Sequence, residues 1–531
     1  MVMARLKYPI SIQTFEEIIE EGYVYFDKTA FVYDLASCGK VYFLSRPRRF
    51  GKSLLVSTLK SYFLGHKEFF KGLAIDSLEK NWYEYPVMHL SFNGIEFTER
   101  GALERVLEEF VADAEDLYGR GKNASSLGSR FKAVIANAHK KTGRRVVVLI
   151  DEYDKPLLDV MGLEKFIVEY EEKITFEEKH RRVLKSFFST FKDADADLRF
   201  VFLTGVTKFS QISVFSGFNQ PEDISLDDHY ETICGITKEE LYTKLDAQIT
   251  EMAQKFKITP EQMRLRLKKK YDGYHFNENM VDIYNPFSLL NAFAKKRLDN
   301  YWFASGSPEY LVRLLAKSNR NISDMAGKYY PIADFVDYRA DVEKPLPMIY
   351  QSGYFTIKDF DSETQTYKLD FPNEEVRQGF LAILASDYFK TADSPQSWAT
   401  RIVKSLSLAD MEQLERLFTA FFASIPYEFR TSMNKERHFQ YTFYLMLSLI
   451  SGYTVLAEKH QSEGRVDCIV ETKGDVYIFE FKRDGSAEEA LRQIEEKGYA
   501  REYSADKRCI HCLGVNFSSE TGTIDGWLVK D

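Results

Sequence analysis

The sequence has no long apolar run and little cysteine. None of its hydrophobic stretches approaches the roughly 20 residues that a membrane-spanning helix needs, so we expect no membrane contact. The N-terminal stretch MVMARLKYPISIQTFEEIIEEG turns acidic too early for a signal peptide. Scattered cysteines, odd in number, argue against a disulfide framework and for a reducing cytoplasm; the five are Cys38, Cys234, Cys468, Cys509 and Cys512.

A zinc site and an excess of positive charge are also missing. Cys509 and Cys512 have CxxC spacing, but no second pair completes a zinc site, so we expect two thiols of a core strand. The net charge of −9 gives no global support for nucleic-acid binding. Local basic runs keep such binding open, although each is more often a solvated helix face: residues 46–52, 179–185 and 264–275.

The length of 531 residues and the 44% hydrophobic fraction are typical of a globular protein of about three domains. Strands are predicted at 41–45, within 144–158 and at 198–206, with helices between them at 52–64, 102–118 and 177–194. Strands that alternate with helices indicate an α/β domain, a parallel sheet covered by helices, which we place at 1–235.

The rest of the chain divides into two further regions. Residues 236–425 have a mainly helical pattern, with short strands expected at 353–358 and 366–371. Residues 426–531 follow the order αβββαββ, which is long enough for a separate α/β domain.

The stretch FLSRPRRFGKS has the strand–loop–helix context of a phosphate-binding loop that ends in Gly51, Lys52 and Ser53. Backbone N–H groups at the helix start would face the phosphates, Lys52 would reach the β- and γ-phosphates, and Ser53 would bind Mg²⁺. The usual first glycine is replaced by Arg46, which with Arg48 and Arg49 could add positive charge around the phosphates. On its own, a GKS triplet would be interpreted as a helix cap on a basic loop.

About a hundred residues later, VVVLIDEYD supplies a buried strand that ends in acids. Asp151 would hold Mg²⁺ through water and Glu152 would polarise the attacking water. Thr204 ends the next strand, with Thr207 and Lys208 close behind, and would face the γ-phosphate between the other two strands; a plain strand terminus is the alternative.

A second set of charged residues lies near the C-terminus. Glu480 and Lys482 are two apart on one predicted strand and share a face, and Asp467 could lie opposite them in a hairpin. Two carboxylates of this kind would bind a divalent metal, while the lysine stabilises transition-state charge or orients water. Gln493 on the following helix could join the site, and Glu436 or Glu458 could add a carboxylate. The alternative is a surface ion pair between Glu480 and Lys482.

With these motifs in hand, the chain resembles a bacterial family of AAA-ATPase-like proteins that carry a C-terminal PD-(D/E)xK nuclease domain. The resemblance covers nearly the whole chain. It includes RPRRFGKS, VVVLIDEYDKPL, FVFLTGVTKFSQISVFSGFN, CGIT, YDGYHF, YNPFSLL, YQSGYFTI, FPNEEVR, GRVDCIVE, YIFEFK and QIEEKGYA. The loop with Arg46 is the form found in that family.

The resemblance implies ATP and Mg²⁺ as cofactors and nucleic acid, with DNA favoured, as a partner. It implies catalytic roles for Glu152, Asp467, Glu480 and Lys482 and metal binding by Ser53, Asp151, Asp467 and Glu480. We add Gln493 as a catalytic residue because of its place on the following helix. The nucleotide-binding residues expected from the loop and the acidic strand are Arg46, Pro47, Arg48, Arg49, Phe50, Gly51, Lys52, Ser53, Leu54 and Asp151, with Thr204 added because it ends the next strand.

Our leading hypothesis is an ATP-dependent, metal-dependent nuclease, active in defence or mobile-element biology by analogy alone. Its helical middle would act as a lid or nucleic-acid surface, with 264–275 as the contact. The first alternative is a nucleotide-gated switch whose nuclease fold binds without cutting. The second is an oligomeric ATPase that receives an arginine from a neighbouring subunit, with Arg181, Arg182 and Arg199 as candidates.

Overall fold

The computed structural model describes most of the chain: residues 6–122, 124–163, 165–169, 172–208, 221–305, 311, 314–315, 322–336, 344–389, 394–425, 436–449, 453–461 and 464–530. Its backbone forms two compact units, Met1–Val376 and Arg377–Asp531. The first contains a parallel sheet and the second a mixed sheet, so the predicted α/β fold class is confirmed. The division into three domains stays a prediction. No helix in the described part of the chain is long and apolar enough to span a membrane.

The first unit is built on a five-stranded parallel sheet in the order β2-β3-β6-β1-β7. Its strands are β1 (Val41–Ser45), β2 (Val87–Ser91), β3 (Val146–Asp151), β6 (Leu198–Gly205) and β7 (Glu222–Asp223). Every residue of β3 is buried, as expected for a strand covered on both faces. Because β6 lies between β1 and β3, the carboxyl ends of these three strands meet at one edge.

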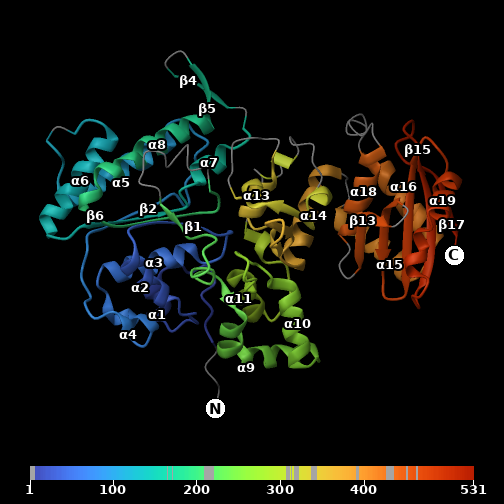
Figure 1. Cartoon of the computed structure of the whole chain (residues 1–531), viewed down its shortest axis with the longest axis horizontal. Helices are drawn as coiled ribbons and strands as arrows, with labels where there is room; N and C mark the ends of the chain where they lie inside the picture. The colour runs from blue at the N-terminus through green and yellow to red at the C-terminus, as the bar shows by residue number, and fades with distance from the viewer. Residues whose placement is uncertain are drawn as a thin grey trace. The chain divides into compact units, whose positions relative to one another are not determined.

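Helices cover both faces of this sheet (Figure 1). On one face lie α1 (Phe15–Glu20), α2 (Thr29–Cys38), α3 (Lys52–Phe63) and α4 (Ala74–Leu78); on the other lie α5 (Ala102–Tyr118), α6 (Leu127–Thr142) and α8 (Phe176–Asp193). The connection from β3 to α8 contains α7 (Lys155–Val160) and the hairpin of β4 (Phe166–Glu169) and β5 (Glu172–Thr175). The strands and helices predicted for this region are confirmed to within a few residues.

The rest of the first unit is mainly helical, as predicted. It contains β8 (Ile236–Thr237), α9 (Lys238–Phe256), α10 (Pro260–Tyr271), β9 (Ile283–Tyr284), α11 (Pro286–Lys295) and α13 (Leu346–Gln351). Apolar residues of α9, α10 and α11 form one buried cluster. A small antiparallel sheet in the order β10-β12-β11 contains both predicted strands and adds a third: β10 (Lys328–Pro331), β11 (Thr356–Asp361) and β12 (Thr366–Asp370).

Helix α14 (Glu374–Phe389) begins in the first unit and continues into the second. The second unit then contains α15 (Pro395–Ser407), α16 (Met411–Ser424), α18 (Glu436–Ser448), β13 (Thr454–Gln461), β14 (Gly464–Glu471), β15 (Asp475–Arg483), α19 (Ala487–Glu496), β16 (Cys509–Phe517) and β17 (Ile524–Lys530). From α18 onward this is the predicted αβββαββ order.

The five strands of the second unit pair in sequence order, and only β15 and β16 run parallel. Helix α19 makes the crossover between them and lies directly on the sheet. An ideal β-carbon on Gly514 would lie 2.2 Å from the Ala487 carbonyl oxygen, so only glycine allows this approach. Cys509 is exposed on β16, so the expectation of two core thiols was wrong for Cys509, whereas Cys512 is half-buried and packs against the core of this unit. The physical reason is that β16 begins at the surface and becomes fully buried only from Leu513 onward.

Candidate nucleotide and nuclease-like sites

The predicted phosphate loop joins β1 to α3, at the sheet edge where β1, β6 and β3 end. Gly51 precedes α3 with a φ of 94°, a left-handed conformation that favours glycine. Within the described residues, no side chain accepts a hydrogen bond from the first N–H groups of this 12-residue helix. A helix N-terminus of this kind binds phosphate in other proteins.

Lys52 is buried at the first position of α3. Its Nζ donates hydrogen bonds to the carbonyl oxygens of Arg46, at 2.9 Å, and Pro47, at 3.1 Å. Burial lowers the pKa of the Lys52 ammonium, while the neighbouring carboxylates of Glu152 and Asp151 oppose the shift. The ammonium thus lies within the loop and close to the acids at the end of β3.

The acids and Thr204 lie together at the ends of β3 and β6. The Thr204 hydroxyl donates to Asp151 Oδ1 at 2.5 Å, and both side chains are buried. Thr204 thus lies on β6, the strand between β1 and β3, and its predicted orientation toward a γ-phosphate stays a prediction. Glu152 has a left-handed φ of 55°, a strained backbone of the kind that clusters at functional sites. Burial raises the pKa of Glu152, and Lys52 opposes the shift.

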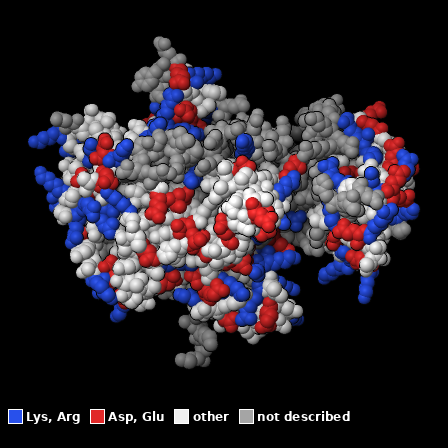
Figure 2. Space-filling model, viewed as in Figure 1, with Lys and Arg blue, Asp and Glu red and all other residues white. Residues whose placement is uncertain are grey.

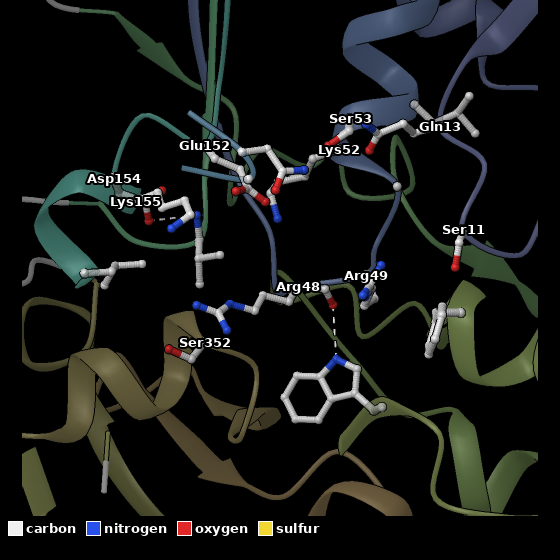
Figure 3. Close-up of a pocket in the computed structure, with 18 of the residues that line it drawn as sticks. Ser11, Gln13, Arg48, Arg49, Lys52, Ser53, Glu152, Asp154, Lys155 and Ser352 are labelled. Atoms are coloured by element: carbon white, nitrogen blue, oxygen red, sulfur yellow. Dashed lines mark hydrogen bonds between the residues drawn. The ribbon is translucent and has the colours of Figure 1, made fainter. Parts of the chain in front are cut away.

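A cavity of about 1010 Å³ opens in front of the loop, large enough for a nucleotide (Figure 3). Its lining includes Arg48, Arg49, Gly51, Lys52, Ser53, Leu54 and Glu152, together with residues 9–13 and with Phe287, Trp302, Ser352 and Tyr354. Arg46, Pro47, Phe50, Asp151 and Thr204 are not among the residues that line it. The cavity is therefore walled by parts of the chain far apart in sequence.

Sequence reasoning missed Asp154, which also lines this cavity. Its Oδ2 accepts hydrogen bonds from the N–H groups of Val206 (2.9 Å) and Thr207 (2.6 Å) and from the Thr207 hydroxyl (2.7 Å). Thr207 thereby holds Asp154, and the Lys208 ammonium pairs with Asp223 at 2.8 Å. In the sequence, Asp154 could have been found as the third acid of the IDEYD stretch.

The side chain of Arg46 turns away from the cavity. Its guanidinium donates to the carbonyl oxygens of Ser225 (2.6 Å) and Tyr230 (3.2 Å) and lies 3.9 Å from the centre of the Phe276 ring. Only 1% of Arg46 is exposed. The expectation that Arg46 adds charge around the phosphates is thus not met by its side chain, which anchors the loop, whereas Arg48 and Arg49 line the cavity.

Two further residues of the loop, Pro47 and Phe50, are anchored as well. An ideal β-carbon on Gly353 would lie 2.5 Å from the Pro47 β-carbon, so the backbone at Gly353 packs on that ring. The Phe50 ring lies 4.7 Å from Tyr274 and 5.6 Å from Phe276, and its carbonyl accepts the Gly235 N–H. Segments after residue 220 therefore hold the loop in place at Pro47 and at Phe50.

The arginines considered as donors to a neighbouring subunit all have partners within this chain. Arg181 pairs with Glu177 at 2.7 Å and Arg182 with Glu172 at 3.0 Å. Arg199 donates to the Ala36 carbonyl at 2.5 Å, at the end of β6 opposite Thr204. Their role between subunits stays a prediction.

The basic run at 264–275 is largely neutralised. On α10, Arg264 pairs with Asp246, Lys268 with Asp282 at 2.5 Å, and Lys269 with Glu374 at 2.7 Å. Figure 2 shows acidic and basic side chains intermingled around α9 and α10. A nucleic acid would have to displace these carboxylates in order to bind there.

The predicted nuclease residues come together on β14, β15 and α19. Lys482 Nζ donates to Gln493 Oε1 at 2.6 Å and lies 4.0 Å from Glu480 Oε1, to which Gln493 Nε2 also donates. Asp467 Oδ2 accepts the Phe481 N–H at 2.9 Å across the antiparallel hairpin. The structure thus places all four side chains at one end of the hairpin.

The donor chemistry at this place fits a magnesium ion. Asp467 and Glu480 supply carboxylate oxygens, and Mg²⁺ commonly takes one or two carboxylates besides water and substrate phosphate. The side chains of Glu436 and Glu458 lie outside the described residues. Within the described residues, no group of three or more His, Cys, Asp or Glu side chains is arranged to hold a metal.

Tyr499 is a further residue near this site that the sequence analysis missed. It is buried in η6 (Tyr499–Tyr503), and its hydroxyl donates to the Arg465 carbonyl at 3.0 Å. Burial raises the pKa of Tyr499, and the charges of Glu480 and Asp467 act in the same direction. In the sequence, Tyr499 could have been found as the aromatic residue directly after QIEEKG.

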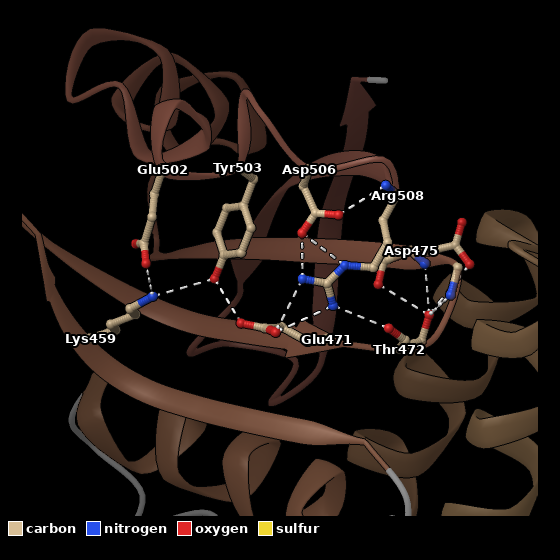
Figure 4. Close-up of polar contacts among 9 residues, drawn as sticks. Lys459, Glu471, Thr472, Asp475, Glu502, Tyr503, Asp506 and Arg508 are labelled. Atoms are coloured by element: carbon tan, nitrogen blue, oxygen red, sulfur yellow. Dashed lines mark hydrogen bonds and ion pairs between the residues drawn. The ribbon is translucent and has the colours of Figure 1, made fainter.

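Polar contacts fix η6 to the sheet (Figure 4). The Tyr503 hydroxyl donates to Glu471 at 2.9 Å, and Arg508 binds both Glu471, at 3.3 Å, and Asp506, at 2.6 Å. Lys459 pairs with Glu502 at 2.6 Å. These contacts connect η6 with β13 and β14, and so position Tyr499 beside the carboxylates.

Comparison with known proteins agrees with both regions. Residues 9–215 match a family model described as "Predicted AAA-ATPase", and residues 434–527 match one described as "PD-(D/E)XK nuclease superfamily". The chain is 35% identical over 536 residues to "Uncharacterized protein in vnfD 5'region" of Azotobacter chroococcum mcd 1, with 99% of each chain covered. The protein thus belongs to a family of predicted AAA-ATPases that end in a domain of the PD-(D/E)XK nuclease superfamily.

Proposed function

We propose that the protein binds ATP with Mg²⁺ in its first unit and uses this nucleotide to control a metal-dependent nuclease in its second unit. The proposed nuclease activity is supported by one observation: four side chains come together at one end of the β14–β15 hairpin, namely Asp467, Glu480, Lys482 and Gln493. The uncapped start of α3 beside Lys52 supports the nucleotide site.

In the first unit, the N–H groups at the start of α3 and the Lys52 ammonium would bind the phosphates. Ser53 and Asp151 would hold the metal, which neutralises phosphate charge when bound. Glu152 would orient the attacking water, and Thr204, through its hydrogen bond, would keep the Asp151 carboxylate in place. The middle region would act as a lid, since its residues line one wall of the cavity.

In the second unit, Asp467 and Glu480 would hold a divalent metal, which supplies Lewis-acid chemistry at a phosphodiester. Lys482 would stabilise the negative charge that develops on the phosphate. Gln493 accepts from Lys482 and donates to Glu480, so it would fix the positions of both side chains. The substrate would be nucleic acid, with DNA favoured, and a role in defence or mobile-element biology in the cytoplasm would follow by analogy.

A second candidate function is a nucleotide-gated switch whose C-terminal unit binds nucleic acid without cutting it. The observation that favours it is that Gln493 binds both Lys482 and Glu480, so each of these side chains has a protein partner at this place. The two candidates differ in one respect, because a switch would keep its function when Lys482 is replaced by alanine.

The test is a cleavage assay on the purified full chain with Mg²⁺ or Mn²⁺. Plasmid, linear duplex, single-stranded DNA and RNA would be incubated with and without ATP, and phosphate release would be read from the same samples. Glu480→Gln should abolish cutting, whereas its control Glu488→Ala, an exposed acid on α19, should not. Lys52→Ala should abolish ATP dependence, unlike Lys60→Ala on the exposed side of α3. ATP binding without any cutting would favour the switch.

A further inference from the structure

The indole of Trp302 connects the wall of the nucleotide cavity to the phosphate loop. Its Nε1 donates a hydrogen bond to the Arg48 carbonyl oxygen at 3.1 Å, the dashed line at Arg48 in Figure 3. The ring is buried and packs on Phe303 and Tyr354, each with its ring centre 5.0 Å away. Trp302 and Arg48 are 254 positions apart, so this contact exists only in the folded chain.

The contact sets the orientation of one peptide group of the loop. The peptide between Arg48 and Arg49 is planar and trans, so its C=O and N–H point in opposite directions. When Trp302 binds the Arg48 oxygen, the Arg49 N–H must point away from the indole. Arg49 itself has a left-handed φ of 68°, which a non-glycine residue keeps only where its surroundings hold it. Trp302 supplies one such constraint.

The backbone of Trp302 is bound in turn by a buried carboxylate. Glu375 Oε1 accepts the N–H of Trp302 at 2.9 Å and the N–H of Tyr301 at 2.5 Å, and only 1% of Glu375 is exposed. Burial raises the pKa of Glu375, and the two N–H donors oppose the shift. The Ser288 side chain and the charge of Lys270 also oppose the shift. Burying a carboxyl group is costly unless it is paired, and the N–H groups of Tyr301 and Trp302 are the backbone groups that pair with this one.

Glu375 lies in the first turn of α14, the helix that continues from the first unit into the second. Two contacts therefore lead from the loop to that helix: the one between Arg48 and Trp302, and the one between Trp302 and Glu375, which is a residue of α14. No step depends on an exposed side chain, because Trp302 and Glu375 are both buried.

We propose that Trp302 and Glu375 are positioning residues that couple occupancy of the phosphate site to the first turn of α14. A bound phosphate accepts hydrogen bonds from the N–H groups of the loop. It thereby changes the orientation of the peptide between Arg48 and Arg49, which Trp302 holds. The change passes through the Trp302 backbone to Glu375. This inference rests on the proposed binding of ATP and names how that site would be regulated.

The test compares wild-type full chain with Trp302→Phe, which keeps an aromatic ring but lacks the N–H donor. ATP affinity is measured by calorimetry, and hydrogen exchange of residues 374–389 is followed with and without Mg-ATP. In wild type, ATP should slow exchange in the first turn of α14. In Trp302→Phe, ATP should still bind, with affinity reduced by no more than about tenfold for one lost hydrogen bond, and the response of α14 should vanish.

Further variants separate this role from simple stabilisation. Glu375→Ala should behave like Trp302→Phe. Glu375→Gln keeps an acceptor oxygen, so its α14 should still respond to ATP. Trp82→Phe is the matched control, because this tryptophan lies against Phe70 and Tyr62 away from the cavity lining. An equal α14 response in wild type and Trp302→Phe would overturn the coupling, as would bound ATP without any response in wild type. Absence of ATP binding by calorimetry would instead overturn the proposed function, and the coupling with it.

Discussion

The backbone of Gly353 rests on the ring of Pro47, with no room for a side chain between them. Gly353 has a φ of 84°, and an ideal β-carbon there would lie 2.5 Å from the Pro47 β-carbon and 2.7 Å from its γ-carbon. Pro47 is part of the phosphate loop, and Gly353 belongs to the YQSGYFTI segment, far along the chain. Loop and middle region are thus fitted to each other at van der Waals distance.

This contact predicts that Gly353→Ala will weaken ATP binding as well as the fold. The added methyl group must push Pro47, and with it the loop, while the left-handed φ adds about 1 kcal/mol of strain. Gly72→Ala is the matched control, because Gly72 has a φ of 80° with nothing within 4 Å of the added carbon. The melting temperature should fall in both variants, but only Gly353→Ala should lose ATP affinity in calorimetry. Equal affinities would contradict the fit.

A second prediction concerns Arg46, which stands where a phosphate loop usually has glycine. Arg46→Gly should destabilise the protein by about 3–5 kcal/mol, because it leaves a large buried void and several carbonyl groups without their donor. Arg49→Gly, in the same loop, removes an exposed side chain and relieves a left-handed φ, so it should cost about 1 kcal/mol or less. Chemical unfolding of the two variants tests the contrast, and an unchanged stability of Arg46→Gly would refute an anchoring role.

The pair of Thr204 and Asp151 leads to a prediction about hydrolysis. Thr204→Val keeps the shape of the side chain but removes the hydroxyl that donates to Asp151. We expect ATP binding to stay within about threefold and hydrolysis to fall by about 10- to 100-fold, as when a partner that orients a metal-binding group is lost. Thr58→Val removes another buried hydroxyl, one that binds a helix carbonyl at 2.8 Å, and should leave hydrolysis unchanged. Phosphate-release rates of the two variants distinguish a site effect from general damage.

In the second unit, Gln493 lies between Lys482 and Glu480 and should be needed for cutting. Gln493→Ala leaves both charged groups without this partner, so we predict a loss of cleavage rate of about 10- to 100-fold. The adjacent Arg492→Ala, whose side chain is 65% exposed, is the control and should cut normally. Cleavage at the wild-type rate by Gln493→Ala would show that Gln493 only packs against the sheet.

A pH-dependent prediction follows from Asp272. Burial, and next the charge of Asp282, raises the pKa of the Asp272 carboxyl to about 6. A raised carboxyl pKa contributes stability at low pH that is lost as pH rises from the ordinary value to about 6. Asp272→Asn should therefore gain stability relative to wild type between pH 4 and pH 7, by at most about 3 kcal/mol for a shift of this size.

Melting temperatures measured across this range give the test, with Asp282→Asn as the contrast. The hydrogen bond from His275 lowers the pKa of the Asp282 carboxyl, with Lys268 acting in the same direction, so its contribution is present above the ordinary value and lost as pH falls. The loss of stability in Asp282→Asn, relative to wild type, should therefore be largest at neutral pH. Parallel pH curves for the two variants would contradict this assignment.

The order of the elements was predictable because it depends on local pattern, whereas the roles of the predicted site residues stay predictions even where the structure brings those residues together. The apolar run that ends in Asp151 and Glu152 predicted β3, and the runs at 41–45 and 198–206 predicted β1 and β6, whereas β2 was not predicted. The position of β6 between the phosphate-loop strand and the acidic strand was correctly expected. Residues two apart on a strand share a face, so Glu480 and Lys482 were correctly placed together, with Asp467 across the hairpin.

Tertiary structure decided what each charge and each loop residue contacts, because those partners lie far away in sequence. A count of charges on α10 could not reveal that three of its basic side chains pair with Asp246, Asp282 and Glu374. Arg46 is positive in any fold, but only the folded chain brings the Ser225 and Tyr230 carbonyls to it and turns it from the cavity. The link from Trp302 to Arg48 is of the same kind, since burial and long-range packing determine it and no local pattern encodes it.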